Sequence, residues 1–374
     1  MKKLRVCHLS TVHSAFDVRI FHKQCRALSA AGYAVDLVAR CDGDNDAHGV
    51  RIHGLPAAGS RFARMTATIW KAFRVAVKLD ARIYHFHDAE LIVVGLLLKL
   101  LGKTVIYDVH EDVPSAIVNR TWIPRLLRFP FALCCRIAEG IGAVFFDAVI
   151  TATRAIAGKF PQHKTSVVQN YPILHELVQP NQTPYQERPS HIAYVGGITQ
   201  VRGIREMVQA LSLVPTERDI RFVVAGAFEP AGLLREIKNI SGWERVDFVG
   251  WKSRPDVSRL LDTCRAGLLL FHAVPNHIDA QPNKLFEYMS AGIPVVVSDF
   301  PLWREIVAGA QCGLLVDPLD TRAIAEAVTW IIEHPAEAEE MGRRGRHAVR
   351  DKYNWSLESH KLLDVYKRLT DDVG

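Results

Sequence analysis

The clearest indication of the fold is the stretch Asp279-Ala-Gln-Pro-Asn-Lys-Leu-Phe-Glu287-Tyr-Met-Ser-Ala-Gly292-Ile-Pro-Val-Val-Val-Ser298. Proline suits the first turn of a helix and glycine suits its end, so we expect a helix that begins near Pro282 or Asn283 and ends at Gly292. The short β-branched run at 294–298 then predicts a buried strand. A helix that leads directly into such a strand is typical of a parallel sheet covered by helices.

The same alternation extends in both directions along the 374 residues. Further strands are expected, in chain order, at 4–10, 34–39, 83–87, 104–109, 148–151, 166–169, 191–195, 220–225, 246–249 and 267–270. Helices are expected at 20–31, 321–334, 336–350 and 355–369. The segment 175–190 is rich in Pro, Gln and Asn and has weak periodicity, so we interpret it as a linker between domains.

The length of the chain favours two domains, because single hydrophobic cores stop growing near about 250–300 residues. We predict an α/β protein with two doubly wound, Rossmann-like parallel-sheet domains that face a cleft. The predicted parts are an N-terminal domain at 1–176, a linker at 177–190, a C-terminal domain at 191–352 and a final helix and tail at 353–374. Ligands of such sheets bind beyond the carboxyl ends of the strands, so the loops there are the candidates for chemistry.

The composition is that of a globular protein: 49% of the residues are hydrophobic and 23% are charged. This balance excludes disordered, collagen-like and disulfide-scaffold classes. Residues 1–180 hold 23 Lys and Arg against 14 Asp and Glu, whereas the remainder holds 23 against 26. A basic first half and a slightly acidic second half indicate different partners for each, and they argue against nucleic acid as a partner of the whole chain.

The cysteines and the apolar runs predict a cytoplasmic location. The seven cysteines form no Cys-x-x-Cys pair and are interpreted as reduced thiols. The first residues run directly into a strand-like segment and lack the apolar core of a signal peptide. The longest apolar run, Leu91–Leu101, is interrupted by Lys99 and is too short to span a bilayer.

The 279–298 stretch also carries candidate binding groups. The backbone N–H groups at the start of its helix, at Asn283, Lys284 and Leu285, would form an anion site. Glu287 lies one turn further on, where a carboxylate can accept two hydroxyls, as from a ribose. Asp279 precedes the helix and could accept hydroxyls of a second sugar. Taken alone, the stretch fits an ordinary capped helix with a surface glutamate equally well.

A glycine loop forms the second candidate: Gly196-Gly197-Ile-Thr-Gln-Val-Arg202-Gly203 follows a predicted strand and precedes a helix. Glycines let the backbone approach phosphates, and Arg202 could neutralise them. The spacing is neither that of a dinucleotide-binding fingerprint nor that of a P-loop. On its own, the arginine fits a solvated loop position as well.

Together these motifs resemble the retaining glycosyltransferases of family 4, which have the GT-B fold, and in particular the bacterial polysaccharide and lipid-linked glycan type. The resemblance covers nearly the whole chain and rests on the glycine loop, the carboxylate pair of Asp279 and Glu287, the Ala-Gly-Ile-Pro-Val-Val turn and the closing helix. It implies that Glu287 binds the donor ribose and that Asp279, at a position where the family has Glu, contacts the donor sugar. It also implies that the closing helix packs back on the N-terminal domain.

The resemblance assigns further donor-binding residues. Arg202 matches a family Lys that binds the donor pyrophosphate, whereas the family's Arg is replaced by Gly197. Lys284 could supply the missing cation. The Gly-Trp251-Lys segment after the strand at 246–249 matches the backbone that contacts the nucleotide base. The predicted donor-binding residues are thus Gly196, Gly197, Arg202, Trp251, Asn283, Lys284, Leu285 and Glu287.

In the N-terminal half, His110 ends a predicted strand where family members carry a histidine next to the transferred sugar. The resemblance therefore makes His110 and Asp279 the catalytic candidates; the alternative for His110 is a histidine hydrogen-bonded at a strand end. The candidates for contact with the acceptor or the cleft are His13, Asp17, Arg19, His87, Asp88 and Glu111. His85 and His87 share one face of a strand at a spacing that suits a metal, but no third ligand is evident, so acceptor contacts or packing are favoured.

Neither a metal nor another cofactor is expected. Asp42, Asp44 and Asp46 form a carboxylate cluster, but an EF-hand loop would need Gly and Glu where Ala47 and His53 stand. The cluster is interpreted as a solvated turn. GT-B enzymes generally work without a bound metal, because helix amides and cations neutralise the leaving diphosphate.

Two basic amphipathic segments could lie on an anionic membrane. In 61–78 the apolar stripe is Phe62, Met65, Ile69 and Phe73, with arginines and lysines opposite. The segment 120–129 places aromatic residues among arginines. The alternative is a helix that packs on the core with a solvated charged face. We expect a cytoplasmic protein that can associate peripherally with the inner leaflet.

The resulting expectation is a metal-independent glycosyltransferase that moves a sugar with retention from a nucleotide sugar, UDP-linked, to a glycan or lipid-linked saccharide in cell-surface polysaccharide synthesis. The C-terminal domain would bind the donor and the N-terminal domain the acceptor. One alternative is a sugar-nucleotide epimerase on the same fold. The other is a non-catalytic GT-B scaffold that binds polysaccharide or a partner enzyme.

Overall fold

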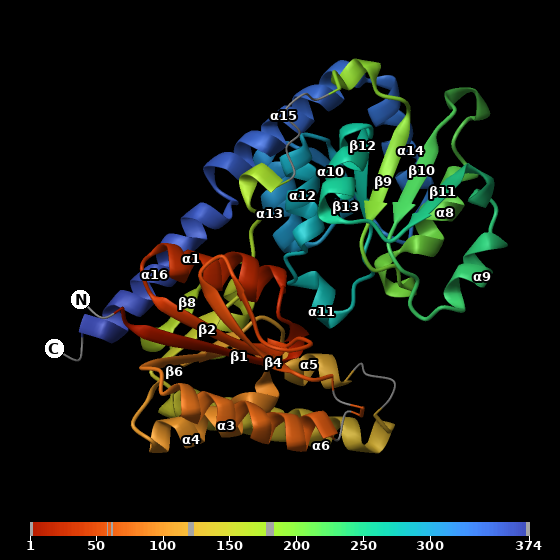
Figure 1. The fold of residues 1–374 in the computed structure, drawn as a ribbon. Helices are drawn as coiled ribbons and strands as arrows, with labels where there is room; N and C mark the ends of the chain where they lie inside the picture. Colours follow the sequence, from red (N-terminus) through yellow and green to blue (C-terminus); the bar gives the residue numbers. More distant parts are fainter. Residues whose placement is uncertain (1–2, 58, 61–62, 119–122, 177–182, 372–374) are drawn as a thin grey trace. The chain divides into compact units, whose positions relative to one another are not determined.

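The computed structural model describes residues 3–57, 59–60, 63–118, 123–176 and 183–371. The chain forms two compact units (Figure 1): the first is Met1–Asn170 together with Ser356–Gly374, and the second is Tyr171–Trp355. Of the linker expected at 177–190, residues 177–182 lie outside the described part of the chain.

The first unit is built on an eight-stranded sheet in the order β3-β4-β2-β1-β5-β6-β7-β8. All neighbours are parallel except β3 and β4, which pair antiparallel. The strands are β1 (Arg5–Ser14), β2 (Ala34–Arg40), β3 (Asn45–Ala47), β4 (Val50–Leu55), β5 (Ile83–Phe86), β6 (Thr104–Val109), β7 (Ala148–Thr151) and β8 (Thr165–Val167). The six strands expected from the sequence are present, whereas β3 and β4 were not anticipated. Asp42, Asp44 and Asp46 are exposed, as expected, but Asp46 lies in β3 rather than in a turn.

Helices cover both faces of this sheet (Figure 1). The alternation along β1 decides what each face meets: Cys7 and Leu9 enter the apolar core under the helices of one face, while His8 faces Tyr366 of the closing helix. The helices of the first unit are a π-type segment Val18–Cys25 that leads into α1 (Arg26–Ala30), then α3 (Ile69–Leu79), α4 (Ile92–Leu100), α5 (Val113–Val118), α6 (Arg125–Phe145), α7 (Arg154–Ala157) and α16 (Trp355–Asp371).

The closing helix α16 returns to the first unit, as expected. Leu362, Val365 and Tyr366 are fully buried there. Glu358, also buried, accepts a hydrogen bond at 2.8 Å from the backbone N–H of Gln169. The closing helix therefore belongs to the same compact unit as β1, the first strand of the chain.

The second unit has a six-stranded sheet, parallel throughout, in the order β11-β10-β9-β12-β13-β14. Its strands are β9 (His191–Val195), β10 (Arg221–Ala225), β11 (Val246–Gly250), β12 (Ala266–Leu269), β13 (Val295–Ser298) and β14 (Gly313–Val316). Its helices are α8 (Ile204–Leu211), α9 (Leu233–Lys238), α10 (Arg254–Asp262), α11 (Pro275–Ile278), α12 (Asn283–Ala291), α13 (Pro301–Ala310), α14 (Thr321–Glu333) and α15 (Pro335–Asp351). Only β14 was missing from the expected strands. The prediction of two Rossmann-like parallel-sheet domains is confirmed.

The 279–298 stretch folds as its proline and glycine indicate. Helix α12 begins after Pro282 and ends at Gly292, which adopts a left-handed conformation with φ of 70°. Its buried side chains, such as Leu285, Phe286 and Met289, enter the core of the second unit. The helix is thereby fixed against β12 and β13.

The apolar stripe expected in 61–78 is only partly correct. Phe62 lies outside the described residues, and Met65 is exposed. The buried side chains of α3 are Ala72, Ala76 and Leu79. Ile69 and Phe73 of the expected stripe do pack against the core of the first unit. Met65 lies in a π-type turn at Arg64–Thr68, whose wider turn departs from the 3.6-residue period. Within the described residues, no helix combines the length and the apolar character that crossing a membrane requires.

Candidate functional site

The glycine loop of the second unit is shaped around a lysine side chain. Gly196 follows β9 with φ of 112°, in the left-handed region that favours glycine. A Cβ atom at this position would lie 2.5 Å from Cε of Lys284. The absence of a side chain at Gly196 therefore makes room for Lys284, which reaches the loop from the first turn of α12.

Lys284 and Arg202 place two positive charges beside this loop. Nζ of Lys284 lies 5.2 Å from the ring centre of Tyr194 and 5.6 Å from that of Phe271, and the guanidinium carbon of Arg202 lies 5.5 Å from the same Phe271 ring. Arg202 also donates a hydrogen bond at 2.9 Å to the carbonyl of Gly197. Among the described residues, neither cation is ion-paired with a carboxylate.

The electrostatics at Lys284 reflect this arrangement. Burial, followed by the charge of Arg202, lowers the pKa of Lys284 to about 7. Aromatic faces stabilise a cation only partly, so the two positive charges are not neutralised by the protein itself. An anion that enters the loop would supply the missing negative charge.

The backbone donors of α12 are fewer than expected. Leu285 donates its N–H to the carbonyl of Pro282 at 3.1 Å, and its side chain is fully buried. The Leu285 amide therefore already has an acceptor in the first turn of α12, and its part in ligand binding stays a prediction. No backbone acceptor for the N–H groups of Asn283 and Lys284 is found within the described residues, so these two remain candidates.

Glu287 is held by an arginine that the sequence pattern did not single out. Oε1 of Glu287 accepts a hydrogen bond at 3.0 Å from Nη1 of Arg254, the first residue of α10. Arg254 also binds Glu176 through its Nε at 3.0 Å. The ion pair fixes the orientation of the Glu287 carboxylate. The only sequence signal for Arg254 is its position just after the Gly-Trp251-Lys segment.

The remaining predicted residues of the second unit are open to solvent. Asp279 directly follows α11 and is exposed. Trp251 directly follows β11, and 76% of its surface is exposed. Neither side chain has a hydrogen bond or ion pair among the described residues. Both are therefore accessible to a ligand, and nothing in the second unit fixes their orientation.

A histidine pair beside the cations was also missed. His272 lies 3.1 Å from Glu206, measured from Nε2 to Oε2. The ring of His277 packs on Phe271 with the ring centres 4.7 Å apart. Burial, together with the charges of Arg202 and His272, lowers the pKa of His277. The chain around Phe271 thus joins the glycine loop to the segment before Asp279.

In the first unit, His13 and His110 meet through their Nε2 atoms at 3.0 Å. Burial alone would lower the pKa of His13, but the hydrogen bond that His13 donates to Asp17 and the charges of Asp88 and Asp17 outweigh it and raise the pKa. Burial lowers the pKa of His110. A protonated His13 can therefore donate to a neutral His110, whose own proton then lies on Nδ1. This Nδ1 has no hydrogen-bond partner among the described residues.

The irregular end of β1, which carries His13, is anchored by Asp88. Oδ2 of Asp88 accepts hydrogen bonds from the backbone N–H groups of Thr11 at 2.6 Å and Val12 at 3.1 Å, and from the hydroxyl of Ser10 at 2.9 Å. Asp88 is buried, so its role in the structure is to hold this end of β1. Glu111, next to His110, is exposed.

Two predicted acceptor-contacting residues are part of the interior. Arg19 donates to both carboxylate oxygens of Asp108, at 3.0 and 2.7 Å, and to the carbonyl of Val168 at 2.9 Å. Although burial would raise the pKa of Asp108, the charge of Arg19 outweighs it and holds the pKa well below its usual range. His87 is also buried and bound to Asp108. Arg19 is thus occupied by an internal ion pair and His87 by an internal hydrogen bond, so acceptor contact by these two side chains is not supported.

A directional chain of hydrogen bonds runs through buried histidines. Burial lowers the pKa of His8 and of His85, so both rings are neutral. Asp108 can only accept, so Nδ1 of His87 donates to it at 3.1 Å, and Nδ1 of His8 donates to Nε2 of His87 at 2.9 Å. The Tyr366 hydroxyl then donates to Nε2 of His8 at 3.2 Å and accepts from Nδ1 of His85 at 2.8 Å. The chain ends at Nε2 of His85.

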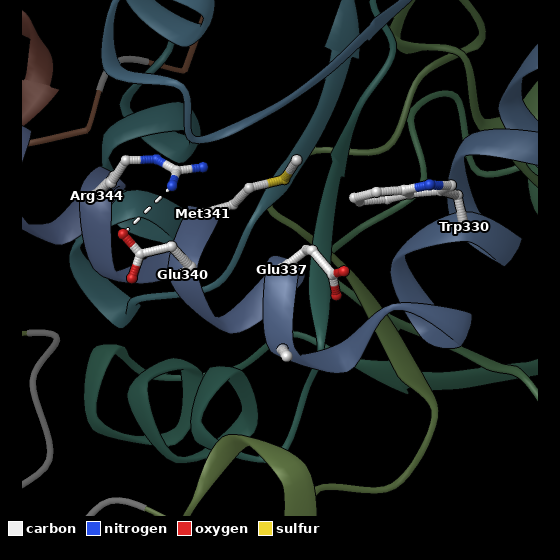
Figure 2. A pocket seen from close by; sticks show the side chains of 6 residues that line it. Trp330, Glu337, Glu340, Met341 and Arg344 are labelled. Atoms are coloured by element: carbon white, nitrogen blue, oxygen red, sulfur yellow. Dashed lines mark hydrogen bonds and ion pairs between the residues drawn. The ribbon is translucent and has the colours of Figure 1, made fainter.

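A separate groove of about 520 Å³ lies between α14 and α15 of the second unit. Figure 2 shows Met341 and Trp330 along it, with Arg344 paired to Glu340. Its charged groups neutralise one another in part, and it shares no residue with the predicted site. The groove is therefore not a candidate for the chemistry derived above.

Comparisons with known proteins relate both parts of the chain to glycosyltransferases. A model of the glycosyl transferase 4-like domain matches residues 18–170, and a model of glycosyl transferases group 1 matches residues 177–348. The fold is similar to sucrose-phosphate synthase from Thermosynechococcus elongatus, with a TM-score of 0.76, 20% identity and coverage of 99% of this chain and 100% of that one. Both parts of the chain thus match glycosyltransferase domain models, and the fold is the GT-B fold.

A second solved structure has a similar fold. It is Anabaena Alr3699/HepE in complex with UDP-glucose, with a TM-score of 0.74, 13% identity and coverage of 98% of this chain and 100% of that one. Glycogen synthase of Mycobacterium tuberculosis is 24% identical over 180 residues, which is 48% of this chain and 42% of that protein. N-acetyl-alpha-D-glucosaminyl L-malate synthase of Bacillus anthracis is 24% identical over 225 residues, which is 53% of this chain and 56% of that protein. The match thus spans about half the length of these relatives.

Proposed function

We propose that this chain transfers a sugar, with retention of anomeric configuration, from a UDP-sugar to a saccharide or lipid-linked saccharide in cell-surface polysaccharide synthesis. The observation that carries the proposal is the pair of cations at the glycine loop, Lys284 and Arg202, which no carboxylate among the described residues neutralises. A nucleoside diphosphate brings negative charge to such a loop, and the similar Anabaena protein was solved in complex with UDP-glucose.

The second unit would hold the donor. The diphosphate would lie against Lys284 and Arg202, with the amides of Asn283 and Lys284 as further donors. Glu287, oriented by Arg254, would accept the ribose hydroxyls. The exposed Asp279 and Trp251 would contact the sugar and the base. Gly197 has no side chain and cannot supply a phosphate cation, so Lys284 would act in its place. A Cβ at Gly197 would lie 2.6 Å from Nη1 of Arg202, so the glycine leaves room for that arginine.

The first unit would handle the acceptor and the catalytic histidine. The Nδ1–H of His110 is a donor for a sugar hydroxyl, because His13 occupies the other ring nitrogen. Asp17 caps the helix that begins at Val18, and Glu111 is exposed beside His110, so both carboxylates could accept acceptor hydroxyls.

Transfer would then proceed without a metal and without a protein nucleophile. The acceptor oxygen forms a bond to the anomeric carbon on the face from which the diphosphate oxygen departs. The acceptor proton passes to that leaving oxygen. The residues of the chain contribute position and charge: Lys284 and Arg202 stabilise the negative charge that develops on the leaving diphosphate.

The test is a thermal-shift screen of UDP, GDP, ADP and their sugar conjugates, followed by a transfer assay with the donor that binds. Binding to the native state should raise the melting temperature through mass action. The shift should appear with UDP and one UDP-sugar, disappear in Glu287→Ala, and persist in Glu305→Ala, an exposed glutamate of α13. If UDP-sugar is converted without an acceptor, the epimerase alternative replaces transfer. Binding without any turnover would support the scaffold alternative.

We also propose that α6 rests on an anionic membrane surface. Its Leu126, Phe129 and Val144 have 90%, 74% and 68% of their surface exposed. Arg125 and Arg128 lie beside the first two. Exposed apolar side chains next to arginines fit the interface of an anionic bilayer. Of the segments 61–78 and 120–129 predicted for this role, residues 61–62 and 120–122 lie outside the described part of the chain.

Co-sedimentation with liposomes at low salt tests the membrane proposal. The chain should sediment with vesicles that contain anionic lipid, less with neutral vesicles, and less again after the double change Leu126→Ser and Phe129→Ser. Leu213→Ser, at an exposed leucine of the second unit, is the matched control and should not alter sedimentation. Equal sedimentation of all variants would contradict the proposal.

A further inference from the structure

We propose that His8, His85 and His87 form a structural binding site for a transition-metal ion such as Zn²⁺ inside the first unit. One nitrogen of each ring can serve as ligand, and these three atoms lie within 4.8 Å of one another. All three side chains are buried. Imidazole nitrogens are the ligands that Zn²⁺ and its neighbours in the first transition row accept readily.

The sheet assembles the third ligand. His85 lies at the end of β5 and His87 follows two residues later, so both point to the same face. In the parallel pairing of β1 with β5, His8 lies directly opposite His85. The spacing of His85 and His87 alone offers two ligands, and the strand pairing brings His8 to them from 77 positions earlier in the chain.

The outer nitrogens of the three rings are already held by other groups. Nδ1 of His87 is 3.1 Å from Oδ2 of Asp108, while Nε2 of His8 and Nδ1 of His85 lie 3.2 and 2.8 Å from the hydroxyl of Tyr366. Histidine ligands of metals commonly donate their second nitrogen in this way, to a carboxylate or another oxygen. In the metal-bound form His8 carries its proton on Nε2, so that the Tyr366 oxygen accepts from both rings.

The second nitrogen of each ring, which faces the other two rings, is the candidate metal ligand. Nε2 of His85 is buried and has no hydrogen-bond partner among the described residues. The nearby Oδ2 of Asp108 is 3.9 Å away, beyond hydrogen-bonding distance. Nδ1 of His8 and Nε2 of His87 are 2.9 Å apart and would separate to roughly 3.3 Å, the spacing of two ligands on a tetrahedral ion with bonds of about 2.0–2.1 Å. An ion would satisfy the orphaned lone pair of His85 together with the other two.

Such an ion would stabilise the first unit and take no part in transfer. It would connect β1 to β5 directly and would fix Tyr366, and with it α16, through the two rings that bind the tyrosine hydroxyl. The site is independent of the donor residues in the second unit. Its existence can therefore be tested without any assumption about the activity of the protein.

Metal analysis of the full chain is the first test. The folded protein, incubated with ZnCl₂ and then dialysed against metal-free buffer, should retain about one zinc per chain by mass spectrometry of the element. His85→Gln should retain little, whereas His163→Gln, at an exposed histidine of the same unit, should retain as much as the unchanged protein. Folded protein without zinc, or equal zinc in His85→Gln, would overturn the proposal.

Cobalt provides a second test that does not depend on the folding of a variant. The folded, unchanged chain with Co²⁺ should show the visible absorption bands of a four-coordinate site, and added Zn²⁺ should remove them. Tyr366→Phe should keep the bands and lower the metal affinity about 10–100-fold, as expected for loss of a group that orients ligands. The absence of such bands in the folded, unchanged chain would overturn the proposal.

Discussion

The two units differ in whether their site cations have a carboxylate partner. In the first, the buried Arg19 is matched by Asp108, which accepts two hydrogen bonds from it at 3.0 and 2.7 Å. In the second, Lys284 and Arg202 lie beside aromatic rings and a backbone carbonyl, without a carboxylate partner among the described residues. The first arrangement is electrostatically complete within the protein, whereas the second becomes complete when an anion binds. The difference separates a charge that holds a fold together from charges that are kept for a ligand.

The largest expected effect is on the stability of the first unit when the Arg19–Asp108 ion pair is broken. Arg19→Met leaves Asp108 buried without its cation, and such a loss typically costs about 3–5 kcal/mol. Urea unfolding of the first unit should therefore shift to markedly lower denaturant. Arg304→Met, which breaks an exposed pair with Asp299, should change stability far less, because solvent screens exposed pairs. Similar effects of the two changes would show that the Arg19 pair has no special role.

Removing a cation from the glycine loop of the second unit should not lower stability. Lys284→Met removes a cation whose burial is unfavourable, so the free energy of unfolding should be unchanged or raised. UDP affinity should fall by about 1.5–3 kcal/mol, the range for hydrogen bonds to charged groups, which is roughly 10–150-fold. Calorimetric titration with UDP measures it, with Lys238→Met on the exposed face of α9 as control. If Lys284→Met lowered stability and left UDP affinity unchanged, Lys284 would be a structural cation like Arg19, which contradicts the account.

A smaller effect is expected in the pH dependence of UDP affinity, which also tests whether Lys284 binds the diphosphate. Because the pKa of Lys284 is about 7 in the free protein, UDP binding should raise it and take up a proton. UDP affinity should thus be highest near and below pH 7 and fall by up to about tenfold per pH unit above it. Titrations at pH 8 in two buffers of different ionisation enthalpy measure the proton uptake. Lys284→Arg stays charged and should lose this dependence; an identical pH slope in both proteins would refute the role of Lys284.

Local signals allowed the sequence to predict much of the fold. Proline and glycine mark both ends of α12, and β-branched runs mark the interior strands, since these signals lie within a few residues of what they specify. Strands β3 and β4 were missed because their pairing depends on the short turn between them and on the sheet edge. The exposure of Met65 was missed because a π-type turn breaks the helical period before α3.

The candidate site was predictable only where its residues are close in sequence. Asp279, Lys284 and Glu287 lie in one stretch, whereas the partner of Glu287 is Arg254, which the packing of α10 near α12 brings to it. The burial of Arg19 is a property of the assembled first unit and has no local signature. Charge pairing between distant elements was therefore the part that the sequence could not supply.

The most decisive experiment compares UDP with uridine in calorimetric titrations of the unchanged chain and of Lys284→Met. We predict that the unchanged chain binds UDP and binds uridine far more weakly, and that Lys284→Met loses most of this preference for the diphosphate. Equal affinity for UDP and uridine, or a preference for UDP that survives in Lys284→Met, would contradict the conclusion that the cations at the glycine loop are kept for a diphosphate.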